Sequence, residues 1–109
     1  LRAVDDCIQL VKVCKATLRH NSGSVASVHA WPKVWRITTA PIFWKLPPWN
    51  QLFVLIHECT HLALDTDDYA YRFEAKFATL PPRVRRSNAD SVAMYIATVL
   101  KIKSTALRD

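Results

Sequence analysis

The chain has 109 residues, half of them hydrophobic, so we expect a single domain over residues 1–109 with one buried core. The longest apolar run, residues 52–56, is far too short to span a bilayer, so no membrane insertion is expected. The formal charge of +6 suits acidic partners, but the basic residues are scattered and only residues 81–86 are dense, which favours a solvated surface without nucleic-acid binding.

The first predicted element is an amphipathic helix over residues 3–19, where apolar residues recur at spacings of three and four. This helix would place Cys7 and Cys14 on one buried face, too far apart to bridge each other. The odd number of cysteines leaves their redox state undecided. Between residues 25 and 46, β-branched and aromatic residues broken by prolines predict one or two short strands, the best being 34–39.

A second helix is predicted over residues 51–64, with Asn50 as its cap. Because this stretch is apolar nearly all round, we expect the helix to be buried. The remaining predicted elements are a polar turn at 65–68, a helix over 69–80 that ends at two prolines, and a helix from 91 to about 103 capped by residues 87–90.

His57, Glu58 and His61 form the pattern H-E-x-x-H on the predicted buried helix. Residues four apart share a helical face, so both imidazoles can reach one metal ion. Glu58 lies beside them, where it can contact a metal-activated water without binding the metal. A chance match on a surface helix is the alternative, but these polar groups would be costly in an apolar helix without partners. The pattern therefore predicts Zn²⁺ with Glu58 as catalytic base.

A catalytic zinc usually has three protein ligands and one open position, so a third ligand must come from elsewhere. The turn at 65–68 directly follows the motif helix, and its aspartates can fold back toward the metal. A Glu on a separate helix is the other common solution, and Glu74 lies nearer to the motif than such ligands usually do. The candidate carboxylates after the motif are Asp65, Asp67, Asp68, Glu74 and Asp90.

Residues 57–71, HECTHLALDTDDYAY, and the Asn-Ala-Asp segment at 88–90 resemble the aspzincin family of deuterolysin-type and peptidyl-lysine metalloendopeptidases. The family pattern is H-E-x-x-H, then G-T-x-D-x-x-Y-G, then N-A-D. The resemblance covers an active-site core of about residues 42–95. It implies a compact, zincin-like fold of the α+β class, mostly helical, with a small β-sheet edging the cleft.

Carried over by position, the resemblance implies that Asp68 is the third zinc ligand beside His57 and His61. It implies that Tyr71 is catalytic and supports the oxyanion of the tetrahedral intermediate, a task that suits a phenol donor. Asp90 matches an acidic residue that binds the substrate's lysine in lysine-specific members, which implies a preference for lysine. The same Asp90 also fits a helix cap.

Three positions depart from the family pattern. Asp65 and Arg72 stand where the pattern has Gly, and Ala93 stands at a second acidic position of lysine-specific members. If position 65 needs a positive φ, Asp tolerates it better than most residues. Arg72 brings a cation close to the site, and Ala93 weakens the case for strict lysine specificity.

We therefore expect a zinc metalloendopeptidase that hydrolyses protein or peptide substrates with a zinc-activated water. The alternatives are a catalytically impaired metal-binding remnant that binds a protein, and a basic nucleic-acid-binding module that merely contains the motif. A start at Leu1 and the resemblance suggest a trimmed piece of a secreted bacterial protease or toxin-type effector, acting outside cells or delivered into a target cell. The basic charge would suit an acidic protein inhibitor.

Overall fold

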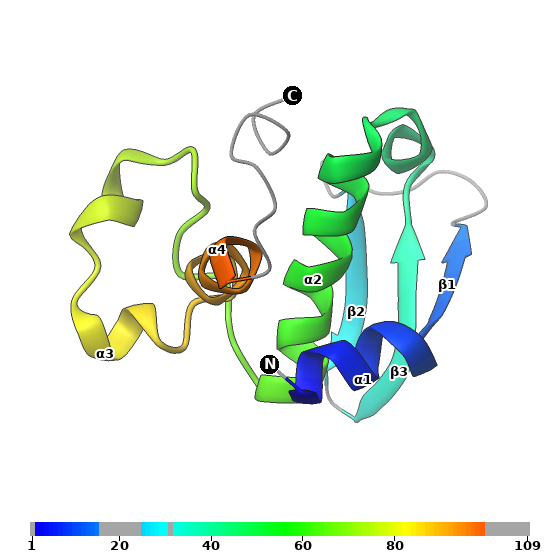
Figure 1. Cartoon of the computed structure of the whole chain (residues 1–109), viewed down its shortest axis with the longest axis horizontal. Coiled ribbons are helices and arrows are strands. Elements are labelled where there is room, and N and C mark those ends of the chain that lie inside the picture. The colour runs from blue at the N-terminus through cyan, green and yellow to red at the C-terminus, as the bar shows by residue number, and fades with distance from the viewer. Residues whose placement is uncertain (1, 16–24, 31, 100–109) are drawn as a thin grey trace.

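The computed structural model describes residues 2–15, 25–30 and 32–99. Helices predominate beside one three-stranded mixed sheet, which is the predicted α+β class (Figure 1). The elements in chain order are α1 (Arg2–Leu10), β1 (Lys12–Lys15), β2 (Ala26–Ala30), β3 (Lys33–Thr39), the 3-10 helix η1 (Pro41–Lys45), α2 (Pro48–Leu64), the 3-10 helix η2 (Ala75–Thr79), α3 (Pro82–Arg85) and α4 (Ala89–Val99).

The sheet has the strand order β1-β3-β2, with β3 parallel to β1 and antiparallel to β2. β3 confirms the predicted strand over 34–39, and β2 is the second strand of that region. Ile37 at the centre of β3 is fully buried in the core cluster. Within the described ranges, β2 has a neighbouring strand on one side only, so its other edge offers free backbone groups to a partner.

The predicted helix over residues 3–19 is wrong in its second half. The helix α1 ends at Leu10, and the chain continues as β1. Val13 of β1 pairs with Ile37, and this parallel pairing with a distant strand outweighs the local helical pattern. Cys7 is buried in the core as predicted, but Cys14 lies on β1 and is partly exposed, so the two do not share a helical face. Residues 16–24 lie outside the described part.

The long helix α2 is the centre of the fold. It packs against α1, α4, β2 and β3 (Figure 1), and its apolar residues, among them Ile56 and Leu62, are fully buried, which confirms the predicted buried helix. The helix begins earlier than predicted, at Pro48, with Pro47 as N-cap. Proline suits the first helical position, where Pro48 lies, because it lacks an N–H that would need a partner. Asn50 therefore lies inside the first turn and is not the cap.

The chain reverses direction at Asp65, which ends α2 in the left-handed conformation with φ 56° and ψ 38°. It is the one non-glycine residue with positive φ in the described ranges. The position thus needs the backbone geometry that the family pattern fills with Gly, and Asp tolerates it. This turn directs residues 66–68 back along the side of α2.

The predicted helix over residues 69–80 is wrong, since only the 3-10 helix η2 forms there. The backbone N–H groups of Tyr69 and Ala70 both donate to Asn88 Oδ1, at 2.8 and 3.0 Å. The N–H of Arg72 donates to Asp90 Oδ2 at 2.7 Å. These side-chain acceptors replace the carbonyls that a helix would supply, and they hold the segment as a loop against the start of α4.

The last helix, α4, confirms the predicted helix in its described part but begins at Ala89, two residues earlier than expected. The N–H of Val92 donates to the carbonyl of Asn88 at 3.0 Å, and this hydrogen bond closes the first turn of α4. The short helix α3 was not predicted. None of the helices in the described ranges has the length and apolarity that a membrane crossing requires.

Candidate metal centre

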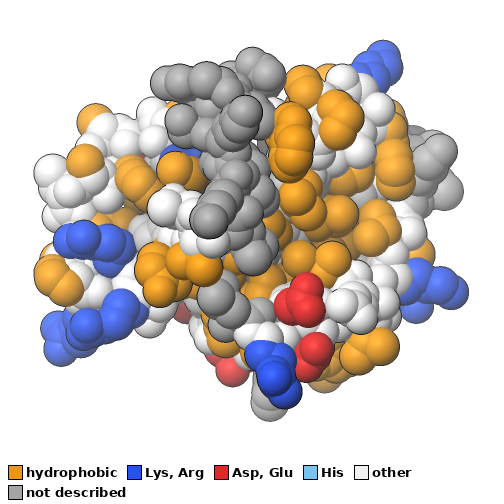
Figure 2. Space-filling view, in the orientation of Figure 1, with side chains coloured by type: hydrophobic (Ala, Val, Ile, Leu, Met, Phe, Trp, Pro, Cys, Tyr) orange, Lys and Arg blue, Asp and Glu red, His pale blue; other side chains and the backbone are white. Residues whose placement is uncertain are grey.

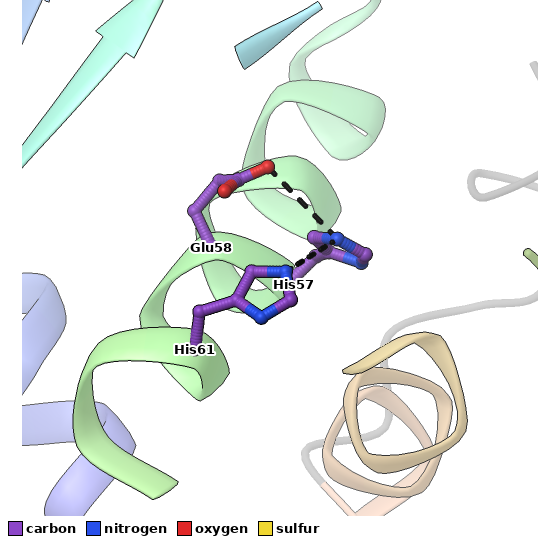
Figure 3. A group of neighbouring side chains, drawn as sticks. All are labelled: His57, Glu58 and His61. Atoms are coloured by element: carbon purple, nitrogen blue, oxygen red, sulfur yellow. Dashed lines mark hydrogen bonds and ion pairs between the residues drawn. The ribbon is translucent and has the colours of Figure 1, made fainter. Parts of the chain in front are cut away.

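His57 and His61 lie on successive turns of α2, and their imidazole rings face the same side (Figure 3). Their Nε2 atoms are 3.3 Å apart. Asp68, on the turn that follows α2, places Oδ1 3.1 Å from His57 Nε2 and 3.2 Å from His61 Nε2. The structure thus brings three candidate ligand atoms together in a nearly equilateral triangle.

This triangle has the size that a tetrahedral zinc site requires. Zinc binds imidazole nitrogen and carboxylate oxygen at about 2.0–2.1 Å, so two ligand atoms of a tetrahedron lie about 3.3–3.4 Å apart. The three separations of 3.1, 3.2 and 3.3 Å are close to that value. Two imidazoles and one carboxylate also suit zinc chemically, and a fourth corner remains for a reacting group. The residues present therefore fit the metal.

The other nitrogen of each histidine is held by the protein. Assigned as the hydrogen-bearing atom, His57 Nδ1 donates to Asp90 Oδ1 at 2.6 Å, and His61 Nδ1 donates to the carbonyl of Thr66 at 2.8 Å. With hydrogens on both Nδ1 atoms, the Nε2 lone pairs point into the triangle. These contacts fix the orientation of both rings before any metal binds.

Asp90 meets His57 from the first turn of α4. Its second oxygen accepts the backbone N–H of Arg72 at 2.7 Å, and the residue is only 4% exposed. Both carboxylate oxygens therefore have donors within the protein. The structure places this predicted substrate-binding residue behind a candidate ligand, with little surface left toward the cleft.

The turn between α2 and Asp68 is held by two buried threonines, Thr60 and Thr66, of which Thr66 matches the threonine of the family pattern. Thr60 donates its hydroxyl to the carbonyl of His57 at 2.7 Å, and Thr66 donates its hydroxyl to Thr60 Oγ1 at 2.8 Å. Both threonines are nearly inaccessible. In the sequence, Thr60 could be recognised by its position three residues after His57. A threonine at this spacing on a helix can donate its hydroxyl to a carbonyl of the preceding turn.

Glu58 lies next to the triangle without forming one of its corners, with Oε2 3.9 Å from His57 Nε2. The ligand atoms of His57, Glu58 and His61 all lie within 4.8 Å of one another. Burial raises the pKa of Glu58 from 4.5 to about 7, although the neighbouring histidines lower it. A carboxyl with this pKa exchanges a proton readily near neutral pH.

The pKa values of the two histidines reflect strong anionic partners. Burial lowers the pKa of His57, but hydrogen bonds to Asp68 and Asp90 outweigh burial and raise it from 6.5 to about 10. Burial also lowers the pKa of His61, and the bonds to Asp68 and to the Thr66 carbonyl more than offset it. Burial raises the pKa of Asp68, but the two histidines hold it well below its usual range. The two imidazoles and Asp68 are thus held together as partners of opposite charge.

Tyr71 lies on the loop after Asp68, with its ring stacked on that of His57 at a centroid distance of 6.1 Å. Its backbone N–H donates to Glu74 Oε1 at 2.7 Å, which fixes the loop at this point. Burial and the negative charge of Asp68 raise the pKa of the Tyr71 phenol. The phenol therefore keeps its hydrogen at neutral pH and remains a donor.

A cleft of about 630 Å³ is lined by His57, Glu58, His61, Asp68, Tyr71 and Asp90. Residues 25–28 at the start of β2 form one wall, α2 contributes both histidines and Glu58, and residues 66–68 and 71–73 form the other wall. The small sheet thus edges the cleft, as predicted. The open edge of β2 belongs to the strand that lines it.

A carboxylate beside two histidines of one helix, above a shared metal position, is the arrangement of metallopeptidases that carry H-E-x-x-H. Comparison with known families agrees, because the family model described as lysine-specific metallo-endopeptidase, the aspzincins, matches residues 3–97. The chain belongs to the aspzincin family of metallo-endopeptidases. The match confirms the predicted resemblance and extends it to residues 3–41, which carry no recognisable motif. No curated protein and no solved structure matches the chain.

We expect Asp68→Ala to lose most of the zinc that the wild type retains, which should be about one ion per chain. The variant removes one corner of the triangle, whereas Asp67→Ala removes the neighbouring carboxylate and leaves the triangle complete. Zinc per chain is measured by elemental analysis after dialysis. Equal zinc in the Asp68→Ala and Asp67→Ala variants would show that Asp68 is no ligand.

Replacing Asp90 by Asn should weaken zinc binding by about 10–100-fold, because the carboxylate that orients His57 and raises its basicity is lost. Affinity is measured by competition with a chelator, with Asp67→Asn as the matched control and circular dichroism to check folding. An unchanged affinity in folded Asp90→Asn would contradict a positioning role.

Proposed function

We propose that this chain is a zinc-dependent endopeptidase in which His57, His61 and Asp68 hold the metal. The observation that carries the proposal is the triangle of three ligand atoms separated by 3.1, 3.2 and 3.3 Å. When bound, zinc supplies Lewis acidity, which lowers the pKa of water to about 7 and polarises the scissile carbonyl.

Glu58 acts as the general base and then as the general acid. Its carboxylate lies beside the ligand triangle, so it is placed to accept a proton from the attacking water. The protonated Glu58 then passes the same proton to the leaving amine.

Tyr71 and Asp90 complete the machinery in different ways. The phenol of Tyr71 lines the cleft beside His57 and donates a hydrogen bond to the oxyanion that develops on the carbonyl. Asp90 contacts no substrate in this scheme. It holds the His57 ring in place through Nδ1 and acts as a positioning residue.

The substrate is a protein or peptide in an extended conformation. The start of β2 lines the cleft, and an extended peptide can add to an open strand edge through backbone hydrogen bonds. Such binding holds the main chain in a fixed register and leaves side chains to face the cleft walls alternately. Binding through the backbone requires no particular sequence.

Asp90 is poorly placed to bind a substrate lysine. Both oxygens of Asp90, the predicted lysine-binding carboxylate, already accept protein donors, and Ala93 is fully buried beneath it on α4. Secretion or delivery into a target cell, a toxin-type effector role and an acidic protein inhibitor rest only on the resemblance and the basic charge. They stay predictions.

The two rival functions have no observation in their favour. A catalytically impaired remnant would not need Glu58 and Tyr71 beside the ligand triangle, where both lie. For a nucleic-acid-binding module, a continuous basic patch is expected. Figure 2 shows Lys and Arg side chains in separate groups around the visible face, one of them over α3.

Changing Glu58 to Gln should lower peptide cleavage by at least about 100-fold while zinc stays bound, because the amide cannot accept the proton. Glu74→Gln is the matched control, since its amide oxygen still accepts the Tyr71 N–H and only a charge outside the triangle is lost. Cleavage of a mixed peptide pool is followed by mass spectrometry, with zinc content measured on the same samples. Full activity in Glu58→Gln would refute the proposed base.

A further inference from the structure

One end of the cleft carries a cation. Arg72 lines the cleft together with Phe53, which precedes His57 by one turn on the same face of α2. The guanidinium carbon of Arg72 lies 4.7 Å from the centroid of the Phe53 ring, and the cation therefore rests on an aromatic face. The backbone of Arg72 is fixed as well, because its N–H donates to Asp90.

This cation has no carboxylate partner among the described residues. The ion pairs of that part of the chain do not include Arg72, and no other Arg or Lys lines the cleft there. Asp68 is engaged by both histidines, and Asp90 by His57 and the Arg72 N–H. Two cleft carboxylates remain: Glu58, which lies beside His57, and Asp67, which follows Thr66 at the His61 end. Opposite charges thus flank the metal position.

We propose that Arg72 binds an acidic side chain of the substrate and makes this endopeptidase selective for Asp or Glu next to the scissile bond. The inference rests on the proposed function and names its substrate class. A guanidinium offers two parallel N–H groups to a carboxylate, and its seat on Phe53 fixes their direction. A substrate lysine at the same position would face a like charge.

The experiment uses the full chain loaded with zinc and peptides that differ only by Glu, Gln or Lys at each position flanking the cleaved bond. At one position, the wild type should show a kcat/KM about tenfold higher for the Glu peptide than for the Gln peptide. The kcat/KM for the Lys peptide should be lower than that for the Gln peptide. Arg72→Gln should abolish this preference, so that the kcat/KM for the Glu peptide falls to that for the Gln peptide. Arg86→Gln, an exposed arginine outside the cleft, should keep the preference.

A preference for Lys, equal rates for all peptides, or an acidic preference that survives Arg72→Gln would each overturn the inference. Cleavage of no peptide at all by the zinc-loaded wild type would overturn the proposed function, and the specificity with it.

An independent observation concerns two cysteines between α1 and α2. The Sγ atoms of Cys7 and Cys59 lie 2.7 Å apart, although both are free thiols in the structure. The two residues are 2% and 0% exposed. Even carbon atoms, which are smaller than sulfur, pack without a bond at about 3.5–4.0 Å. The thiols are therefore closer than unbonded packing favours.

We infer that Cys7 and Cys59 form a disulfide when the chain folds under oxidising conditions. One S–S bond forms and two S–H bonds break, and the two electrons and two protons pass to a small-molecule disulfide, which becomes two thiols. Cys59 lies inside the motif, between Glu58 and His61. The bond would tie α1 covalently to the turn of α2 that carries both histidines.

The chain is refolded with oxidised or reduced glutathione, denatured, alkylated and weighed. After oxidative refolding the wild type should bind one alkyl group, at Cys14, whereas Cys14→Ser should bind none and Cys7→Ser two. The oxidised wild type and Cys14→Ser should also unfold at a temperature about 10 °C or more above their reduced forms, a rise that Cys7→Ser lacks. Alkylation of all three cysteines of the oxidised wild type would overturn the bond, as would protection that persists in Cys7→Ser.

Discussion

Each of the two ring nitrogens of His57 contacts an aspartate, and most of the site depends on these two contacts. Asp68 lies at Nε2 and Asp90 at Nδ1, at 3.1 and 2.6 Å. The first aspartate comes from the turn after α2 and the second from the start of α4, so one side chain joins three parts of the chain. Because Asp90 also accepts the N–H of Arg72, the cleft wall is fixed by the same carboxylate.

This arrangement explains how an apolar helix carries so many charged groups. α2 packs on nearly all sides, and an isolated ionised side chain there would be strongly unfavourable. Here Asp68 contacts both histidines and Asp90 contacts His57, so each of these carboxylates has an imidazole as its partner. A bound metal ion would supply the positive charge in place of protonated histidines. Removing one member leaves the others unpaired in a buried setting, which is more costly than removing the whole set.

Short-range patterns in the sequence predicted the buried helix, the strand β3, the motif and the family. They failed where distant residues decide the structure. The chain after Leu10 follows β3 into a sheet, which nothing within residues 3–19 reveals. The loop at 69–80 stays open because Asn88 and Asp90 supply its acceptors from the next helix. The role of Asp90 could not be predicted for the same reason. Its position in the chain does not tell that it contacts Nδ1 of His57 instead of a substrate.

The loop that forms one wall of the cleft is attached to α4 almost entirely through its backbone. Asn88 and Asp90 bond to main-chain groups of residues 69, 70 and 72, and none of these bonds involves a loop side chain. The side chains of Tyr69 and Arg72, which are at least partly exposed, can therefore change without loosening the attachment, whereas Ala70 is buried. Evolution, or a protein engineer, can diversify this wall by point substitution while the ligand geometry stays intact, which makes the loop a natural place for new substrate preferences to arise.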